Sequence, residues 1–325
     1  MPDPSVSESH PSDRAHPAGP RWAAPVAKAP VDATIELPGS KSITNRALPL
    51  TALASGPSII RGALRSRDTD LMATGLRALG VGIDDSGIDW SVTPAGLRGP
   101  ADVYCGLAGT VARFLVAISA LADGPVHFDG DPRARQRPMR PLLEGLRQLG
   151  VRIDDDDRGA LPLTVLGAGG LPGGECVVDS SASSQFISAL LLVAVHAETS
   201  TTIRHAGPPL PSLPHIEMTV AMLRDHGVAV DGSTPDTWIV HPGPVRAGVV
   251  DVEPDLSNAA PFLAAAMVTG GVVRIPRWPT RSTQPGAALP DILATMGATY
   301  TLDDAGLTLR AGVSLRGVDL DLHDA

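Results

Sequence analysis

One polar stretch ahead of an apolar run contains the residue types best suited to chemistry. Residues 37–50 read LPGSKSITNRALPL, a turn followed by a predicted helix. Ser42 and Thr44 are residue types that cap helix starts, and Arg46 shares a helix face with Ser42. We expect Lys41 just outside the first turn. Free N–H groups, hydroxyls and two cations predict an anion-binding helix start, although an ordinary capped helix with solvated cations explains the stretch equally well.

The lysine in this stretch is unusual for the chain. Only two of the 26 basic residues are lysines, Lys28 and Lys41. A lysine kept among arginines favours a need for a compact ammonium group with three donors rather than a planar fork. Lys28, in a tail with no comparable motif, weakens this inference.

Similar polar segments recur along the chain. Three further helix openings contain Gly109, Thr110 and Arg113; Ser183, Ser184 and Gln185; and Asp255, Ser257 and Asn258. Two loops add Arg133, Arg135 and Arg137 before a helix predicted from Pro138, and Ser212 and His215 at another helix start. Each segment alone is typical of a cap or a solvated charge run. Together they predict one shared site for anions.

A repeat indicates which elements position these residues. The segments LRALGVGI, LRQLGVRI, LRDHGVAV and LATMGATY each predict a helix ended by glycine and followed by a strand, with the glycines at 80, 150, 227 and 297. Apolar helices are predicted at 42–54, 107–122, 183–197 and 256–270, and a strand at 34–37 precedes the first. Because these helices are apolar nearly all round, we expect them to be buried. Each unit reads strand, buried helix, strand, amphipathic helix, strand, strand. The pattern predicts an α/β protein with sheets outside and helices inside, and a doubly wound α/β fold is the alternative.

Composition limits the classes of function. The net charge of −9 gives no global reason to bind nucleic acid or anionic membranes. Cys105 and Cys176 form no CxxC pair, which fits a reducing cytosol and no structural zinc. No apolar run is long enough to span a membrane. Residues 1–31 are rich in Pro, Ser, Ala and His and predict a disordered tail rather than a signal peptide.

The motifs resemble one family in their order. LPGSKSITNRAL, CGLAGTVARF, RARQRPMRPLLEGL, SSASSQF and SLPHIEMT resemble the 5-enolpyruvylshikimate-3-phosphate (EPSP) synthases, also called 3-phosphoshikimate 1-carboxyvinyltransferases, and in particular the actinobacterial type. The likeness runs from about residue 32 to the end. It implies a two-domain inside-out α/β barrel of repeated βαβαββ units. Residues 39–251 would form the shikimate-3-phosphate-binding domain with three repeats, and 32–38 plus 252–325 an incomplete second domain.

The resemblance also implies an activity and its residues. The family transfers the enolpyruvyl group of phosphoenolpyruvate to the 5-hydroxyl of 3-phosphoshikimate, releases phosphate, and uses no cofactor or metal. It implies a cytoplasmic monomer. By the same resemblance, Lys41 would contact both substrates, and Gly109 and Arg137 would bind phosphoenolpyruvate. Ser42 and Arg46 would hold 3-phosphoshikimate. Its shikimate part would also contact Ser183, Ser184 and Gln185, and its phosphate would contact Ser183, Ser184 and Ser212.

Some positions depart from the family pattern. Leu107 stands where many members have Asn, and His215 stands where Tyr is common. The acidic general base is expected just past Ala325, with Asp324 out of register, so we expect this chain to bind substrates weakly and not to turn over. One alternative is UDP-N-acetylglucosamine enolpyruvyl transferase, but its loop cysteine is absent from residues 131–138. Another is an inactive anion-binding remnant.

Overall fold

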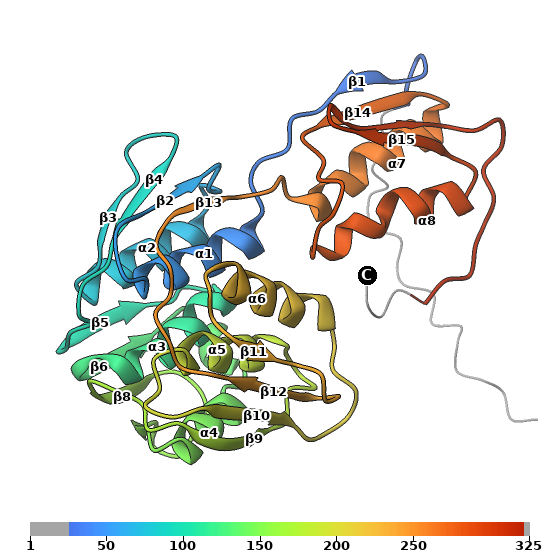
Figure 1. Cartoon of the computed structure of the whole chain (residues 1–325). Coiled ribbons are helices and arrows are strands. Elements are labelled where there is room, and N and C mark those ends of the chain that lie inside the picture. Colours follow the sequence, from blue (N-terminus) through green and yellow to red (C-terminus); the bar gives the residue numbers. More distant parts are fainter. Residues whose placement is uncertain (1–25, 322–325) are drawn as a thin grey trace, which may run out of the picture.

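The computed structural model describes residues 26–321, which form two bodies joined by two crossings of the chain (Figure 1). The larger body has a hydrophobic core whose residues run from Ile43 to Val252. The smaller body has a separate core made of Leu37 and residues between Leu256 and Leu309. Most of the tail predicted at 1–31 lies outside the described residues. Each body therefore buries its own apolar side chains.

All four sheets follow one plan. The strands are β1 (Asp32–Thr34), β2 (Ser58–Arg61), β3 (Gly82–Asp84), β4 (Trp90–Thr93), β5 (Ala101–Tyr104), β6 (Asp123–Asp129), β7 (Arg152–Asp154), β8 (Leu163–Ala168), β9 (Gly174–Val178), β10 (Thr201–His205), β11 (Val230–Asp231), β12 (Thr237–Val240), β13 (Val249–Asp251), β14 (Val272–Pro276), β15 (Thr299–Asp303) and β16 (Gly306–Arg310). Their spatial orders are β13-β2-β4-β3, β5-β6-β8-β7, β9-β10-β12-β11 and β1-β14-β16-β15. In each sheet the first two strands are parallel and the other two pairings are antiparallel. This confirms the predicted α/β fold of repeated units.

The first strand of two sheets comes from a distant part of the chain. β13 pairs with β2, and β1 pairs with β14. The strand predicted at 34–37 lies instead at Asp32–Thr34. Beyond Thr34 the pairing with β14 is extended by a bond from the N–H of Ile35 to the carbonyl of Arg274, and before Asp32 by a bond from the N–H of Val272 to the carbonyl of Val31. Residues after Ile35 therefore leave the sheet of the smaller body and cross to the larger one.

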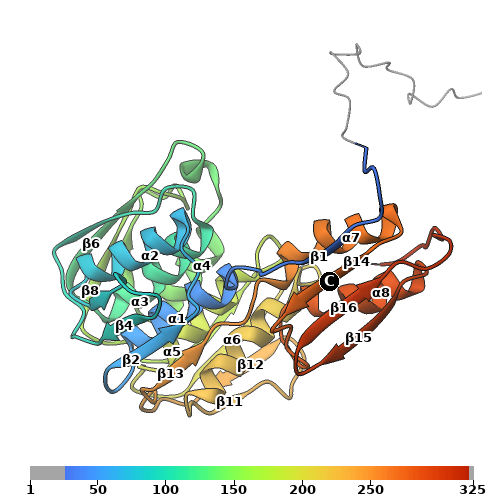
Figure 2. The ribbon, with the colours of Figure 1, turned by 90° about the horizontal axis from the view of Figure 1, so that it is seen from above.

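Three inner helical segments fill the larger body between its sheets (Figure 2). The helices are α1 (Lys41–Ala52), α2 (Arg67–Ala78), α3 (Val116–Ile118), α4 (Arg140–Gln148), α5 (Gln185–Ala194), α6 (Leu213–Asp225), α7 (Ala260–Thr269) and α8 (Leu289–Thr295), with shorter turns η1 (Val111–Leu115), η2 (Ser119–Leu121), η3 (Ala134–Gln136), η4 (Leu256–Ala259) and η5 (Pro285–Ala288). α1, the segment η1-α3-η2 and α5 are buried almost throughout. The helix predicted at 107–122 is thus three short segments, and η1 is a π-helix.

Local chemistry explains where the amphipathic helices end. The four predicted helix-ending glycines, 80, 150, 227 and 297, follow the caps of α2, α4, α6 and α8 and all have positive φ angles between 85° and 112°. Glycine adopts this left-handed conformation without the penalty of a Cβ atom. The predicted helix ends are therefore confirmed at all four positions.

The prediction that every apolar helix is buried is wrong for α7. Its side chains Phe262 and Val268 are 39% and 73% exposed. Inside the larger body the inner helices pack against one another and against α6. In the described part of the smaller body α7 packs mainly on β14, β16 and η4, so one face of the helix meets solvent.

The two crossings of the chain lie side by side. Gly39 forms an isolated bridge with Pro254, the N–H of Ser40 donates to the carbonyl of Glu253 at 2.8 Å, and the N–H of Asp255 donates to that of Pro38 at 2.8 Å. The Cα of Gly39 packs so closely on the next loop that an added Cβ would overlap the carbonyl oxygen of Gly62. The turn before α1 therefore requires glycine.

We expect Gly39→Ala to lower the free energy of unfolding by about 2–4 kcal/mol, because the clash is with backbone that cannot rotate away. Urea denaturation followed by circular dichroism measures the loss. Gly243→Ala is the matched control, because no heavy atom lies within 4 Å of its Cβ position. Equal stabilities of the two variants would contradict the prediction.

Candidate active site

The starts of the three inner helical segments lie together at one end of the larger core. The guanidinium of Arg46, one turn into α1, lies over the ring of Phe114 in η1 at 5.4 Å. The same group donates to Ser188 Oγ, one turn into α5, at 3.4 Å. These contacts join residues about one turn from the start of each segment. The N-terminal ends of all three segments therefore face one region.

The first turn of α1 differs from the prediction. Ser40, not Ser42 or Thr44, is the N-cap, and its side chain accepts from the N–H of Ile43 at 3.4 Å. Thr44 Oγ1 instead donates to the carbonyl of Ser40 at 2.8 Å. Lys41 is the first residue of the helix rather than outside it, because the extended backbone ends at Ser40. The hydroxyl of Ser42 thereby stays free of protein partners in the described part of the chain.

Lys41 is held by its backbone, and its ammonium makes an exposed, weak ion pair. Its N–H donates to Asp255 Oδ2 at 3.2 Å, across the two bodies. Its ammonium lies 3.6 Å from Asp68 and its side chain is 54% exposed. An exposed pair of this kind contributes less than about 1 kcal/mol. The ammonium can therefore leave Asp68 for a stronger anion at little cost.

Arg46 is buried among protein acceptors. Its side chain is 2% exposed, and it donates to Thr219 Oγ1 at 2.8 Å and to the carbonyls of Ser42 and His215 at 3.0 Å each. Desolvation lowers its pKa from 12.5 to about 10, so it stays charged at neutral pH. The guanidinium thus ties α1 to α6 and α5, with its charge just beneath Ser42.

Two arginines meet at Gly109. A Cβ added at Gly109 would lie 2.9 Å from Arg113 Nη1 and from both terminal nitrogens of Arg137. Arg137 Nη1 donates to the carbonyl of Leu107 at 3.1 Å, and Arg113 Nη1 donates to that of Gly109 at 3.1 Å. No ion pair to either guanidinium is present among residues 26–321. Two like charges at a helix start without a counter-ion favour an anion between them.

The start of α5 supplies hydroxyls and an amide. Ser183 Oγ accepts from the N–H of Gln185 at 3.3 Å, and Ser184 is the N-cap without a capping bond. The Oε1 of Gln185 is buried and has no hydrogen-bond partner within residues 26–321. Ser212 begins α6 in the left-handed region with φ of 55°, also without a capping bond. A non-glycine residue there costs about 1 kcal/mol, a strain typical of functional sites.

The sequence of residues 26–325 matches the EPSP synthase (3-phosphoshikimate 1-carboxyvinyltransferase) family. The chain belongs to the EPSP synthase family. The structure is similar to a 2.37 Å structure of EPSP synthase from Acinetobacter baumannii, with a TM-score of 0.75, 26% identity, and coverage of 89% of this chain and 66% of that one. A second EPSP synthase structure from the same organism gives a TM-score of 0.73 at 25% identity, with 89% and 68% covered. This chain spans about two thirds of the length of these structures.

Not every predicted cation of this EPSP synthase family member joins the site. Arg135 is committed to Asp129 by two bonds of 2.9 and 2.6 Å. Arg133 is exposed, and its side chain makes no hydrogen bond or ion pair within the described range. The helix predicted from Pro138 begins instead at Arg140, because residues 134–136 form the separate turn η3. Of the three arginines in this loop, only Arg137 reaches a helix opening.

The fourth polar opening belongs to the smaller body of the EPSP synthase fold. Asp255 caps η4 by accepting from the N–H of Asn258 at 3.3 Å, which is an ordinary cap. Sequence reasoning missed its second contact, the bond to the N–H of Lys41 described above. No local sequence pattern could indicate this bond, because Asp255 and Lys41 are 214 positions apart in the chain.

Other classes of site find little support in residues 26–321. Cys105 and Cys176 are buried, and desolvation raises the pKa of each thiol to about 12, so neither is a ready nucleophile. Between residues 26 and 321, no group of three or more His, Cys, Asp or Glu side chains could hold a metal ion. In the same range, no helix has both the length and the apolar character needed to cross a bilayer.

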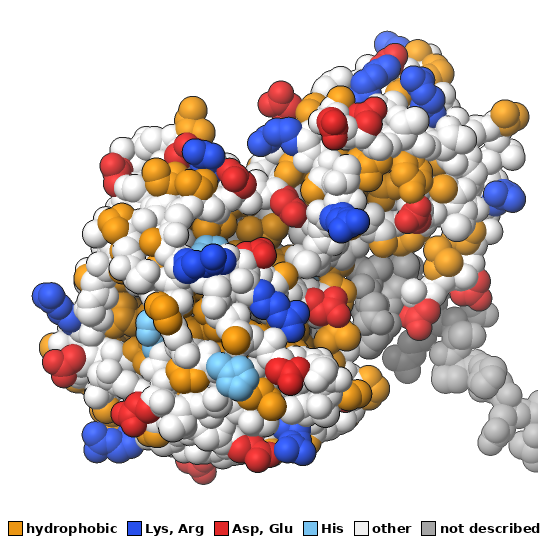
Figure 3. Space-filling model, in the orientation of Figure 1, with side chains coloured by type: hydrophobic (Ala, Val, Ile, Leu, Met, Phe, Trp, Pro, Cys, Tyr) orange, Lys and Arg blue, Asp and Glu red, His pale blue; other side chains and the backbone are white. Residues whose placement is uncertain are grey.

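Charge is local rather than global. On the face shown in Figure 3, basic and acidic side chains are interspersed and form no continuous basic surface. The cations of the site are set by individual contacts at helix starts. Any anion bound at these helix starts would therefore be held by these few groups, and not by a general field.

His215 is a neutral neighbour of Arg46. It lies half-buried in the first turn of α6, and its carbonyl accepts from Arg46. Burial, and then the charge of Arg46, lower the pKa of the imidazole from 6.5 to about 4. A neutral imidazole can donate or accept a hydrogen bond beside Ser212 without adding charge.

We expect stability to fall as the pH falls from about 6.5 to about 4, because the unfolded histidine then binds a proton that the folded one excludes. The share due to His215 is about 1–2 kcal/mol, allowing for partial solvent exposure. Urea denaturation at about pH 7 and about pH 4.5 measures it by comparing the wild type with His215→Gln. The variant should lose less stability over this window, whereas the exposed control His127→Gln should follow the wild type. Equal losses in all three proteins would refute the assignment.

Proposed function

We propose that the openings of α1, η1 and α5 bind 3-phosphoshikimate and phosphoenolpyruvate side by side, in the arrangement needed to transfer the enolpyruvyl group between them. That this chain binds its substrates weakly and does not turn over stays a prediction. The observation that carries the proposal is the meeting of Arg113 and Arg137 at Gly109, where neither guanidinium has an acidic partner among the described residues. Membership of the EPSP synthase family supports the choice of substrates.

The proposed role of each residue follows from the charge of its side chain and from how close it lies to a helix start. Arg137 and the N–H groups at Gly109 receive the phosphate of phosphoenolpyruvate. Ser183, Ser184 and Ser212 receive the phosphate of 3-phosphoshikimate, while Ser42, Arg46 and Gln185 position its ring. Lys41, whose ammonium is free to leave Asp68, stands between the two anions. These cations offset the repulsion of two polyanionic substrates held together.

The proposed reaction needs no cofactor. Protonation of the methylene carbon of phosphoenolpyruvate lets the 5-hydroxyl oxygen bond to C2, while the O–H bond breaks and its proton passes to solvent. The resulting tetrahedral intermediate loses phosphate by cleavage of the C2–O bond, and the same methyl carbon releases a proton to restore the double bond. Fixed cations stabilise the charge that develops on the departing phosphate. The proposal includes a monomer in the cytoplasm, as the resemblance implies, and the actinobacterial type stays a prediction.

Two measurements on the purified chain test the proposal. Calorimetry with 3-phosphoshikimate should give binding that phosphoenolpyruvate strengthens. A phosphate-release assay containing both substrates separates transfer from binding alone. Release that depends on both substrates supports the transferase. Binding without release identifies an anion-binding protein of the same fold, and the absence of both refutes the proposal.

A further inference from the structure

Arg113 occupies in the second repeat the place that Arg46 occupies in the first. Arg46 lies four residues after Ser42 and donates from Nη1 to its carbonyl at 3.0 Å. Arg113 lies four residues after Gly109 and donates from Nη1 to its carbonyl at 3.1 Å. Each guanidinium lies over a phenylalanine ring of the next inner helix, at 5.4 and 5.5 Å. The repeat has therefore placed two buried arginines equivalently, one beneath each opening.

Arg113 touches all three segments that meet at Gly109. Its Nη2 donates to the carbonyl of Pro138 at 3.4 Å, next to Arg137. Its guanidinium lies over Phe186, the residue after Gln185. The π-helix η1, with its wider turn, contains Arg113. One side chain thus connects the Gly109 opening, the loop of Arg137 and the start of α5.

The burial of Arg113 needs a reason, because it is costly. The side chain is 3% exposed, and its Nε has no partner among the described residues. Desolvation, and then the charge of Arg137, lower its pKa to about 10. A buried, like-charged and incompletely bonded arginine is not explained by stability.

We propose that Arg113 is the positioning residue of this opening. Its planar fork sets the spacing between Gly109 and the loop that holds Arg137, and its stacking aligns the start of α5 with both. It acts through Arg137 and Gln185. The expected effect of Arg113 on ligand affinity rests on the proposed function. Its expected effect on the geometry of the Gly109 opening does not.

Arg113→Lys tests the role of the fork, because lysine keeps the charge but cannot bond two carbonyls and stack at once. Hydrogen–deuterium exchange should rise in peptides covering 105–111 and 133–139, and stay unchanged in 42–50. Exchange equal to the wild type in all three would overturn the inference. This readout uses no ligand, so it decides the inference even where the wild type binds nothing and the proposed function fails.

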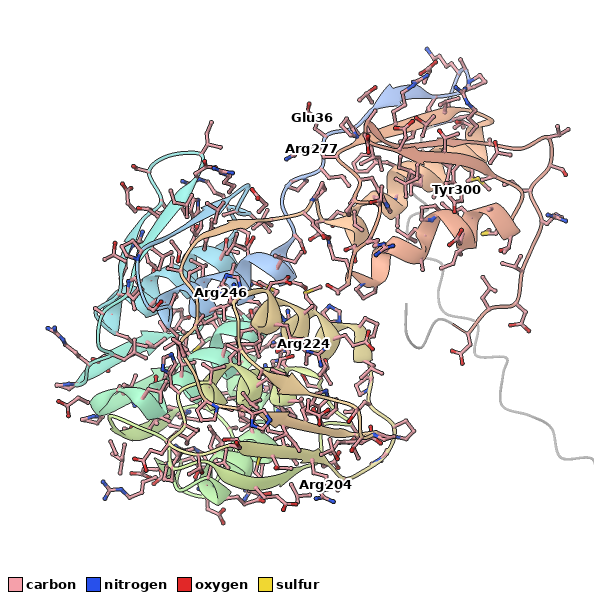
Figure 4. All side chains as sticks on the ribbon, viewed as in Figure 1. Glu36, Arg204, Arg224, Arg246, Arg277 and Tyr300 are labelled. Atoms are coloured by element: carbon pink, nitrogen blue, oxygen red, sulfur yellow. The ribbon has the colours of Figure 1, made fainter. Side chains whose placement is uncertain are left out.

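Ligand binding separates positioning from general weakening. In ³¹P NMR titrations, Arg113→Lys should weaken the binding of phosphoenolpyruvate by about tenfold and the binding of 3-phosphoshikimate by less than about threefold. Equal weakening of both ligands would overturn the inference. The control is Arg224→Met, because Arg224 on α6 also donates to a backbone carbonyl, that of Val230, but lies at the other end of its helix (Figure 4). It should leave both affinities and the exchange unchanged.

Discussion

Replacing Arg46 by methionine is expected to lower the free energy of unfolding by about 2–4 kcal/mol and to weaken 3-phosphoshikimate binding at least about hundredfold. Methionine fills much of the space, but it makes none of the four hydrogen bonds of the buried guanidinium. Ser42, α5 and α6 then lose their common partner, so the hydroxyls proposed for one ligand no longer share a fixed geometry.

Urea denaturation and calorimetry measure the two effects of Arg46→Met separately. The control is Arg204→Met, an arginine on the outer face of β10 that pairs with Glu175 at 2.9 Å with both side chains half-exposed (Figure 4). Such a pair contributes less than about 1 kcal/mol, and the control should bind normally. Wild-type affinity in a folded Arg46→Met protein would show that Arg46 does not organise the site.

Gly109→Ala is expected to weaken phosphoenolpyruvate binding by at least about tenfold, because its Cβ would lie 2.9 Å from three guanidinium nitrogens and occupy the space between Arg113 and Arg137. Stability should change by less than about 1 kcal/mol, since the crowded atoms are ends of side chains and Arg137 is exposed. Affinity for 3-phosphoshikimate should change by less than about threefold, because Arg46 and α6 are untouched.

Titration of both ligands into Gly109→Ala and the control Gly96→Ala measures this difference. No heavy atom lies within 4 Å of the Cβ position at Gly96, so alanine there should be silent. A Gly109→Ala protein that binds phosphoenolpyruvate like the control would place the phosphate elsewhere.

Local signals made much of the fold predictable. Helix-ending glycines depend on the conformation of one residue, so their repeat located α2, α4, α6 and α8 from the chain alone. Apolar runs without a polar face likewise predicted the burial of α1 and α5. The same logic failed for α7, because burial depends on what packs against a helix as well as on its own residues.

The residue types of the candidate site were also visible as polar openings with nearby cations. The burial and the bonding partners of the individual residues were not visible. Arg46, Arg113 and Arg135 look alike in sequence, yet the first two are buried beneath helix openings and the third is exposed and paired with Asp129. Roles for the site residues stay predictions until the variants above are measured.

By itself, the sequence determined the repeated α/β units, the ends of their amphipathic helices, and the residue types at each helix opening, because all of these depend on neighbours within a few turns. Only the tertiary structure decided that β13 completes the sheet of β2, that Ser40 rather than Ser42 caps α1, and that Arg113 and Arg137 meet at Gly109. The physical reason is that sheet pairing and burial join groups far apart in the chain, where neither propensity nor spacing carries a signal.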